Sequence, residues 1–224
     1  MTETDWLQST HPAPMVWFLR RASYRKVRLL ACACCHRAAT YLDTASAESL
    51  AVAERFCDGE TSANDLRAAM VRAQRAADVA RLAAPRTERA GGSYAACSAV
   101  ALACDADINR VVRAIGLAAQ SETEGLGLAR TIRLIRAHYE QVPLVQDVFG
   151  NPFRPAALDR AWLTSTVVAL ARGIYAERAF DRLPILADAL MDAGCDDDDI
   201  LNHCRGDDPH MRGCWVVDRL LGRK

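Results

Sequence analysis

The stretch SANDLRAAMVRAQRAADVARLAA, residues 62–84, decides the fold class of this chain. Ser62 and Asp65 have the spacing of a capping box, in which each side chain accepts a hydrogen bond from the backbone N–H of the other residue. Alanine, arginine and leucine, which favour helices, fill the stretch, and Pro85 follows it. The stretch therefore predicts one long helix.

The rest of the chain has the same character. Runs of β-branched residues are short, and no stretch alternates apolar and polar residues for long, so we expect no sheet. Ser23, Thr164 or Ser165, and Asp196 or Asp197 precede further helix-favouring runs and are expected to cap them. We predict an all-α protein of about a dozen helices, arranged as a multi-helix bundle or as an irregular array of helical hairpins.

Two stretches rich in glycine and proline indicate how the chain is divided. Residues 85–93 (PRTERAGGS) are expected to form a loop or hinge. Residues 150–155 (GNPFRP) cannot be helical, because two prolines and a glycine fall within six residues. We therefore expect an N-terminal helical bundle over residues 1–149, and a C-terminal helical unit over residues 150–224 that packs on it.

Composition indicates the class of protein. The chain has 224 residues, of which 51% are hydrophobic and 25% charged, as in ordinary soluble proteins. Its 28 basic residues balance 28 acidic ones, so no global field attracts nucleic acid or an anionic membrane, and neither is expected as a partner. No apolar run approaches the ~20 residues of a membrane helix, and we expect no secretory leader. We expect a cytoplasmic protein whose nine cysteines are mostly free, buried thiols.

Cysteines and histidines gather near both ends of the chain and are candidate metal ligands. Cys32 and His36 are spaced i, i+4 in a predicted helix and so share one face. His210 and Cys214 have the same spacing in a last helix that we expect to begin at the Asp208-Pro209 pair. Two such pairs on facing helices would supply the four nitrogen and sulfur ligands of a tetrahedral zinc site. The substitutes near them in sequence are Cys195, His203 and Cys204.

Two other interpretations of these residues remain open. Packing as small core residues is favoured, because no C-x₂₋₄-C knuckle is present. Cys204 could instead be a nucleophile with His210 as its base across the Gly206 turn. His203 is a poor base for Cys204, since adjacent side chains on a helix point about 100° apart.

The densest basic segment contains Arg20, Arg21, Arg25, Lys26 and Arg28. Such a cluster can hold phosphate or nucleic acid, but it lacks interleaved aromatic residues and belongs to a neutral chain. We interpret it as a solvated helix face or as a partner for the acidic run at residues 196–199.

Several longer motifs carry a resemblance. They are RKVRLLACACC (25–35), DVFGNPFRP (147–155), ERAFDRLPILADAL (177–190), HCR (203–205) and RGCWVVD (212–218). Together they resemble a family of paralogous helical proteins abundant in planctomycete bacteria, for which the resemblance implies no established activity. The family pattern usually has arginine at the position of His36, so no shared role is implied for that residue. Residues 182–194 resemble a short helical companion motif found beside repeats in the same bacteria, which implies a partner-binding context.

These observations favour a non-enzymatic helical interaction module that binds a protein partner. The alternative is a zinc-binding domain with a structural or regulatory Cys/His site, and the third interpretation is a cysteine-dependent enzyme. No phosphate-cradling loop, dinucleotide fingerprint or HExxH zinc signature is present in the sequence.

Overall fold

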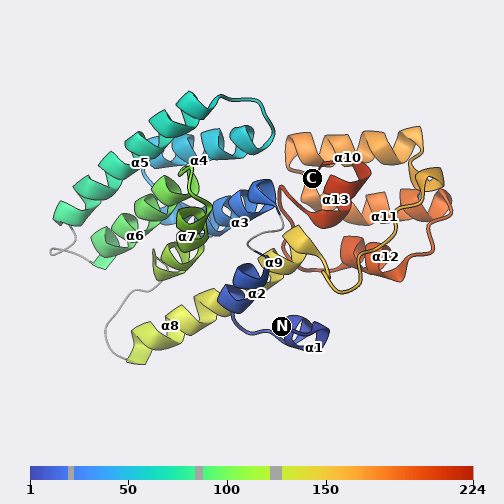
Figure 1. The fold of residues 1–224 in the computed structure, drawn as a ribbon, viewed down its shortest axis with the longest axis horizontal. Coiled ribbons are helices and arrows are strands. Elements are labelled where there is room, and N and C mark those ends of the chain that lie inside the picture. Colours follow the sequence, from blue (N-terminus) through green and yellow to red (C-terminus); the bar gives the residue numbers. More distant parts are fainter. Residues whose placement is uncertain (20–22, 84–87, 122–127, 224) are drawn as a thin grey trace. The chain divides into compact units, whose positions relative to one another are not determined.

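The protein was analysed as a computed structural model, which describes residues 1–19, 23–83, 88–121 and 128–223. These residues form α-helices, short 3₁₀ turns and loops, without a strand in the described ranges, which confirms the prediction of an all-α array of about a dozen helices (Figure 1). The chain divides into two compact units. Unit 1 comprises Met1 with residues 8–142, and unit 2 comprises residues 2–7 with residues 143–224.

This division differs from the expected one at both ends. The boundary falls between Val142 and Pro143 rather than after Phe149, and the short helix α1 (Glu3–Leu7) belongs to unit 2. Hydrogen bonds between residues that are far apart in the sequence hold α1 in unit 2. The Asn151 side chain donates to Glu3 Oε1 at 2.8 Å, and the Gln146 side chain donates to the Trp6 carbonyl at 3.4 Å.

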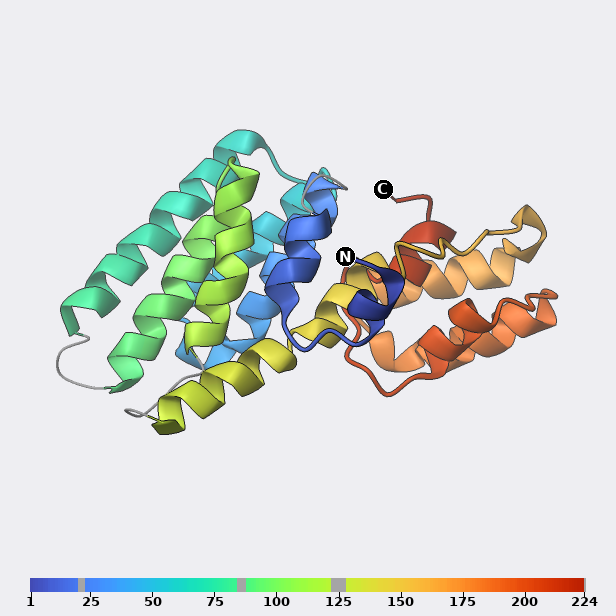
Figure 2. The same cartoon turned by 60° about the horizontal axis from the view of Figure 1, so that its bottom comes forward.

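Unit 1 is a bundle in which successive helices pack against one another (Figures 1 and 2). α5 packs on α4 and α6, α7 packs on α6 and α3, and α8 contacts α7. The helices of this unit are α2 (Pro12–Leu19), α3 (Tyr24–Arg37), α4 (Thr44–Cys57), α5 (Ala63–Ala83), α6 (Glu88–Ala103), α7 (Ile108–Ser121) and α8 (Leu128–Tyr139).

The sequence of residues 62–84 explains why α5 forms and how it packs. Ser62 and Asp65 do form the capping box, since the Asp65 N–H donates to Ser62 Oγ at 3.2 Å and the Ser62 N–H donates to Asp65 Oδ2 at 3.0 Å. Leu66, Ala69 and Ala73, spaced three or four apart, are buried. Small side chains on this stripe let α4 and α6 approach α5 closely.

The predicted loop at residues 85–93 is wrong from Glu88 onward, because α6 begins there. The first part of that loop, residues 85–87, lies outside the described residues. Gly92, which favoured a loop, lies within α6 in a tight position, where an added Cβ would meet the Tyr41 ring at 2.8 Å. The glycine therefore reflects close packing rather than a chain break.

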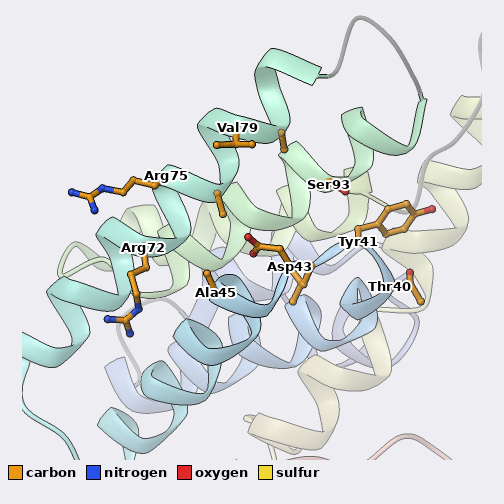
Figure 3. Close-up of a pocket in the computed structure, with 11 residues that line it drawn as sticks. Thr40, Tyr41, Asp43, Ala45, Arg72, Arg75, Val79 and Ser93 are labelled. Atoms are coloured by element: carbon orange, nitrogen blue, oxygen red, sulfur yellow. The ribbon is translucent and has the colours of Figure 1, made fainter.

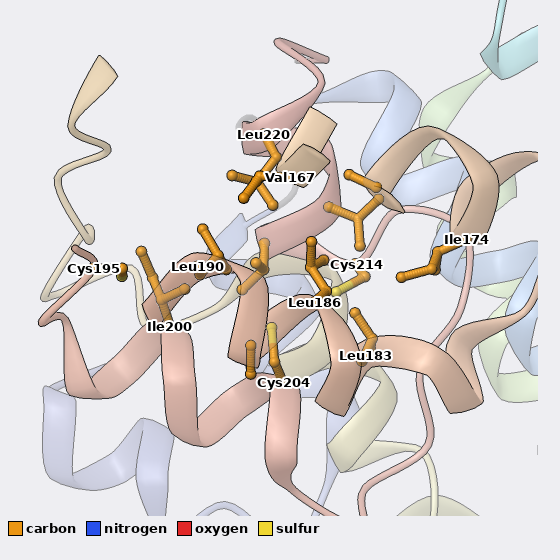
Figure 4. Packing of buried hydrophobic residues seen from close by; sticks show 14 of the residues in the cluster. Val167, Ile174, Leu183, Leu186, Leu190, Cys195, Ile200, Cys204, Cys214 and Leu220 are labelled. Atoms are coloured by element: carbon orange, nitrogen blue, oxygen red, sulfur yellow. The ribbon is translucent and has the colours of Figure 1, made fainter. Parts of the chain in front are cut away.

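Unit 2 is built on α10, which packs on α11 and α13, while α12 packs on α11 and α13. Its further helices are α9 (Val142–Phe149), α10 (Ser165–Glu177), α11 (Leu183–Asp192), α12 (Asp198–Arg205) and α13 (Trp215–Leu220). Figure 4 shows the core between α10, α11, α12 and α13, in which Leu183, Leu186 and Leu190 of α11 meet side chains of the other helices.

Local signals set the ends of these helices as expected. Thr164 caps α10 through the Val167 N–H at 3.3 Å, and Asp197 caps α12 through the Ile200 N–H at 3.1 Å. Among the helices described, none combines the length and the apolar character needed to cross a bilayer.

Candidate metal centre

Four potential ligands converge inside unit 2. They are Asp147 of α9, His203 of α12, His210 of the loop after α12, and Cys214, which directly precedes α13. One ligand atom from each lies within 4.8 Å of one from every other. Asp147 and Cys214 are buried, and the side chains of His203 and His210 are 17% and 7% exposed. Among the residues that the structure describes, this group is the one that brings together enough donors to hold a metal ion.

The contacts within the group share a common centre. Asp147 Oδ1 lies 2.7 Å from His210 Nδ1 and 3.2 Å from His203 Nε2. Cys214 Sγ lies 3.2 Å from the same His203 Nε2. In a tetrahedral zinc site with bonds of about 2.0–2.3 Å, the ligand atoms are about 3.3–3.8 Å apart. For the four atoms to surround an ion, the contacts of 2.7–3.2 Å would have to lengthen by a few tenths of an ångström, and the widest separations, up to 4.8 Å, would have to shorten by about 1 Å.

The surroundings hold these side chains in place. The Met211 N–H donates to Asp147 Oδ2 at 3.0 Å, which fixes the carboxylate. The rings of His203 and His210 meet edge to face at a centroid distance of 4.8 Å, and His203 also packs on Trp215 at 5.1 Å. His210 Nε2 is buried and has no hydrogen-bond partner among the described residues. His210 therefore contacts Asp147 through Nδ1, and its Nε2 is a buried nitrogen whose hydrogen-bonding capacity is not used by the described residues.

The electrostatics of the group depend on the buried carboxylate. Burial acts to raise the pKa of Asp147, but hydrogen bonds from His203 and His210 outweigh burial and bring this pKa below its ordinary value. Burial, together with the negative charge of Asp147, raises the pKa of the Cys214 thiol well above its ordinary value. Without a cation at the site, Cys214 is therefore a protonated, unreactive thiol.

The same geometry argues against a cysteine nucleophile at this position. A catalytic Cys-His-Asp arrangement needs the thiol on one imidazole nitrogen and the carboxylate on the other. Here Asp147 and Cys214 both contact His203 Nε2. Cys204, the nucleophile considered from sequence, is fully buried in the core of unit 2, where burial raises its pKa to about 12 (Figure 4).

The structure places the sequence-predicted ligands in three different settings. His210 and Cys214 are in the converging group, and the substitute His203 joins them. Cys32 and His36 lie in unit 1, where Cys32 is buried in α3 and His36 Nε2 lies 2.9 Å from Glu54 Oε1, so neither belongs to this group. The substitutes Cys195 and Cys204 are core residues of unit 2.

The last helix begins later than predicted. Residues 207–214 form a loop, and α13 starts only at Trp215, so His210 and Cys214 do not share a helix face. Gly213 has φ +98°, a left-handed backbone conformation that ends any helix begun at Pro209. The loop nevertheless brings both side chains to Asp147.

Asp147 was not among the ligands predicted from the sequence. It precedes the other three candidate ligands by more than fifty positions, and a lone aspartate in a helix is usually a surface residue. One signal was available. Asp147 follows the buried Leu144 by three residues and precedes the buried Val148, which puts a carboxylate on the apolar face of its helix.

Two cavities, one in each unit, differ in the residues that line them. A pocket of about 480 Å³ in unit 2 is lined by His203 and Trp215 together with polar residues such as Asn151 and Arg154, so one of the four candidate ligands lies at this pocket. A second cavity, of about 520 Å³ in unit 1, holds no comparable group. In Figure 3 its Arg75 points away from the other labelled side chains. Its carboxylate, Asp43, caps α4 through the Ser46 N–H at 2.9 Å.

Comparison of the chain with protein-family models, curated proteins and solved structures found no match. The functional argument therefore depends on the site itself.

Proposed function

We propose that unit 2 binds one zinc ion through Asp147, His203, His210 and Cys214, and that the ion has a structural or regulatory role. The observation that carries this proposal is the shared contact at His203 Nε2, which both Asp147 Oδ1 and Cys214 Sγ approach at 3.2 Å. Carboxylate, imidazole and thiol groups that converge from separate segments of the chain can serve together as ligands of one cation.

The charge of the group supports a divalent ion. A metal-bound thiolate and a carboxylate carry two negative charges, and two neutral imidazoles add none, so a dication gives a neutral centre in a buried environment. Thiolate and imidazole ligands together favour zinc over magnesium or calcium, which prefer oxygen ligands. Four protein ligands fill a tetrahedral shell, and this is typical of structural rather than catalytic zinc.

The sequence motifs are consistent with this assignment. Asp147, His203 and Cys214 each lie inside one of the motifs on which the family resemblance is based. The ion would link α9, α12 and the start of α13, which are far apart in sequence. Zinc binding would therefore contribute directly to the folding of unit 2.

The test is elemental analysis of the purified full-length protein and its variants. We expect near-stoichiometric zinc in the wild type, loss of zinc in Asp147→Asn and Cys214→Ser, and retention in Cys32→Ala and His36→Gln. The last two variants are the control, because they alter the other candidate pair. Replacement by cobalt should give a cobalt–thiolate charge-transfer band that is absent in Cys214→Ser. Wild-type protein that neither contains zinc nor takes it up would refute the proposal.

A second candidate function, binding of a protein partner, is supported by the surface of α8. Ile132, Ile135 and Tyr139 are spaced three and four residues apart, and each is more than half exposed. Such an apolar stripe on a helix is typical of a surface that docks against another helix. The test compares proteins retained from a cell extract by the wild type and by Ile132→Glu/Ile135→Glu. Equal retention by both would contradict a role of α8 in partner binding.

A further inference from the structure

Arg28 of α3 is a buried cation. It is 5% exposed, its Nη1 donates to the carbonyl of Ala103, and its guanidinium lies 5.5 Å from the centre of the Phe56 ring. In the described part of the chain, no carboxylate forms an ion pair with it. A carbonyl at a helix end and an aromatic face supply only partial negative charge. Burial of a full positive charge among partial negative charges costs free energy, and a bound anion would offset this cost.

Arg28 also lines a cavity of about 530 Å³ in unit 1, between α3, α4, α5 and the turn from α6 to α7. Three more arginines line it: Arg25, Arg67 and Arg110. Nearby carboxylates neutralise two of these, since Arg25 pairs with Asp58 at 3.2 Å and Arg110 pairs with Asp105 at 3.1 Å. Arg28 and Arg67 keep the cavity positive.

The remaining walls of this cavity are apolar. Tyr24, Phe56, Leu66 and Met70 line it, so a ligand would meet an aromatic and aliphatic surface beside the guanidinium groups. Its volume is within the range of ordinary small-molecule sites. Its two thiols, Cys57 and Cys104, do not offer nucleophiles, because burial raises the pKa of each to about 12.

We propose that this cavity, the arginine pocket, binds a small organic oxyanion: a phosphate or carboxylate group carried on an apolar body. The planar guanidinium of Arg28 presents two parallel N–H donors that match either group, and a bound oxyanion supplies the charge that the protein does not. Arg67 at the rim adds attraction, and the apolar walls select a ligand larger than an inorganic ion.

The test uses isothermal titration calorimetry on the full chain with four probes: phenyl phosphate, benzoate, inorganic phosphate and benzyl alcohol. The two aromatic anions should bind, inorganic phosphate should bind more weakly, and the uncharged alcohol should not bind measurably. Arg28→Met removes the charge at nearly constant length and should weaken the aromatic anions at least tenfold. Arg81→Gln, an exposed change on α5 that lines none of the cavities described here, is the matched control and should bind as the wild type does.

A second variant keeps the test valid if Arg28→Met fails to fold. Ala63 is exposed and lines the arginine pocket, so Ala63→Phe narrows it without removing a charge. This variant should lose phenyl phosphate binding while its circular dichroism spectrum stays unchanged. Failure of both aromatic anions to bind the wild type at millimolar concentration would overturn the proposal. Equal binding by the wild type and Ala63→Phe would do the same.

Discussion

Substitution of Gly150 by alanine should destabilise unit 2 through two separate effects. Gly150 ends α9 with φ +64°, a left-handed conformation that residues with a side chain adopt at a cost of about 1–2 kcal/mol. A Cβ at this position would also lie 3.1 Å from two ring atoms of Trp215. The ring is buried and packs on His203, so it cannot move aside freely.

The expected loss in the free energy of unfolding is therefore about 2–5 kcal/mol, because a forced contact in a packed core adds about 1–3 kcal/mol to the backbone cost. Gly194 provides a matched control. It has φ +87°, but an added Cβ meets nothing within 4 Å. Gly194→Ala should cost only the backbone part, about 1–2 kcal/mol.

Urea denaturation of both variants, followed by far-UV circular dichroism and tryptophan fluorescence, measures the difference. Fluorescence reports mainly on unit 2, because Trp6, Trp162 and Trp215 belong to it. We also expect weaker zinc retention in Gly150→Ala than in Gly194→Ala, since displacement of Trp215 would disturb His203. If the two variants lose equal stability, the close approach of Gly150 to Trp215 contributes nothing, and this reasoning is wrong.

Three further outcomes are expected. Thr164→Ala should lower the free energy of unfolding by about 1 kcal/mol, because it removes the cap of α10, whereas Ser165→Ala, the other residue considered from sequence, should have little effect on urea denaturation. A hydrogen bond from Arg136 lowers the pKa of Glu140, so Glu140→Gln should be less stable than the wild type at pH 7. This difference should begin to shrink as pH falls into the ordinary glutamate range and disappear only below the lowered pKa of Glu140, as thermal melting at several pH values can show. A thiol reagent at pH 8 should label few cysteines in the native protein and all nine in denaturant, because burial raises the thiol pKa, to about 12 at Cys57, Cys104 and Cys204.

Most of the fold could be predicted from the sequence, because helix ends depend on neighbouring residues. The Ser62–Asp65 capping box and the caps at Thr164 and Asp197 involve contacts within three positions. The predictions were wrong where contacts between residues far apart in the sequence determine the local structure. The glycines of residues 85–93 predicted a loop, but Gly92 lies in a helix against Tyr41. The compact units divide between Val142 and Pro143 rather than after residue 149, because the contacts of α1 and α9 place both helices in unit 2.

The candidate site could be predicted only in part, for the same reason. His203, His210 and Cys214 were among the nominated residues because cysteine and histidine are rare and chemically distinctive. Asp147 was not, because one carboxylate among 28 acidic residues carries no signal until its burial is known. The i, i+4 spacing of Cys32 and His36 was correct for a helix, but that helix buries Cys32 in the core and leaves His36 beside Glu54.

Although the chain is neutral overall, each unit contains a local charge imbalance, and the two imbalances have opposite signs. Asp147 in unit 2 is a buried carboxylate whose partners are two histidines and a backbone N–H, and Arg28 in unit 1 is a buried guanidinium without a carboxylate partner among the described residues. A net charge of zero excludes a long-range field, but it does not balance charges buried in different units. Each imbalance predicts its own ligand, a divalent cation for Asp147 and an oxyanion for Arg28.

If the two sites are independent, their variants should separate cleanly. Asp147→Asn should abolish zinc retention and leave the binding of phenyl phosphate unchanged, and Arg28→Met should do the reverse. Independent sites in separate units should also raise the thermal midpoint additively when zinc and phenyl phosphate are both present. Loss of both ligands in either variant would show instead that the two units fold as one and that the variant acts through general unfolding. Circular dichroism of each variant without ligand distinguishes these outcomes. If a variant remains folded and loses the binding of one ligand alone, the loss is due to the charge removed at that site.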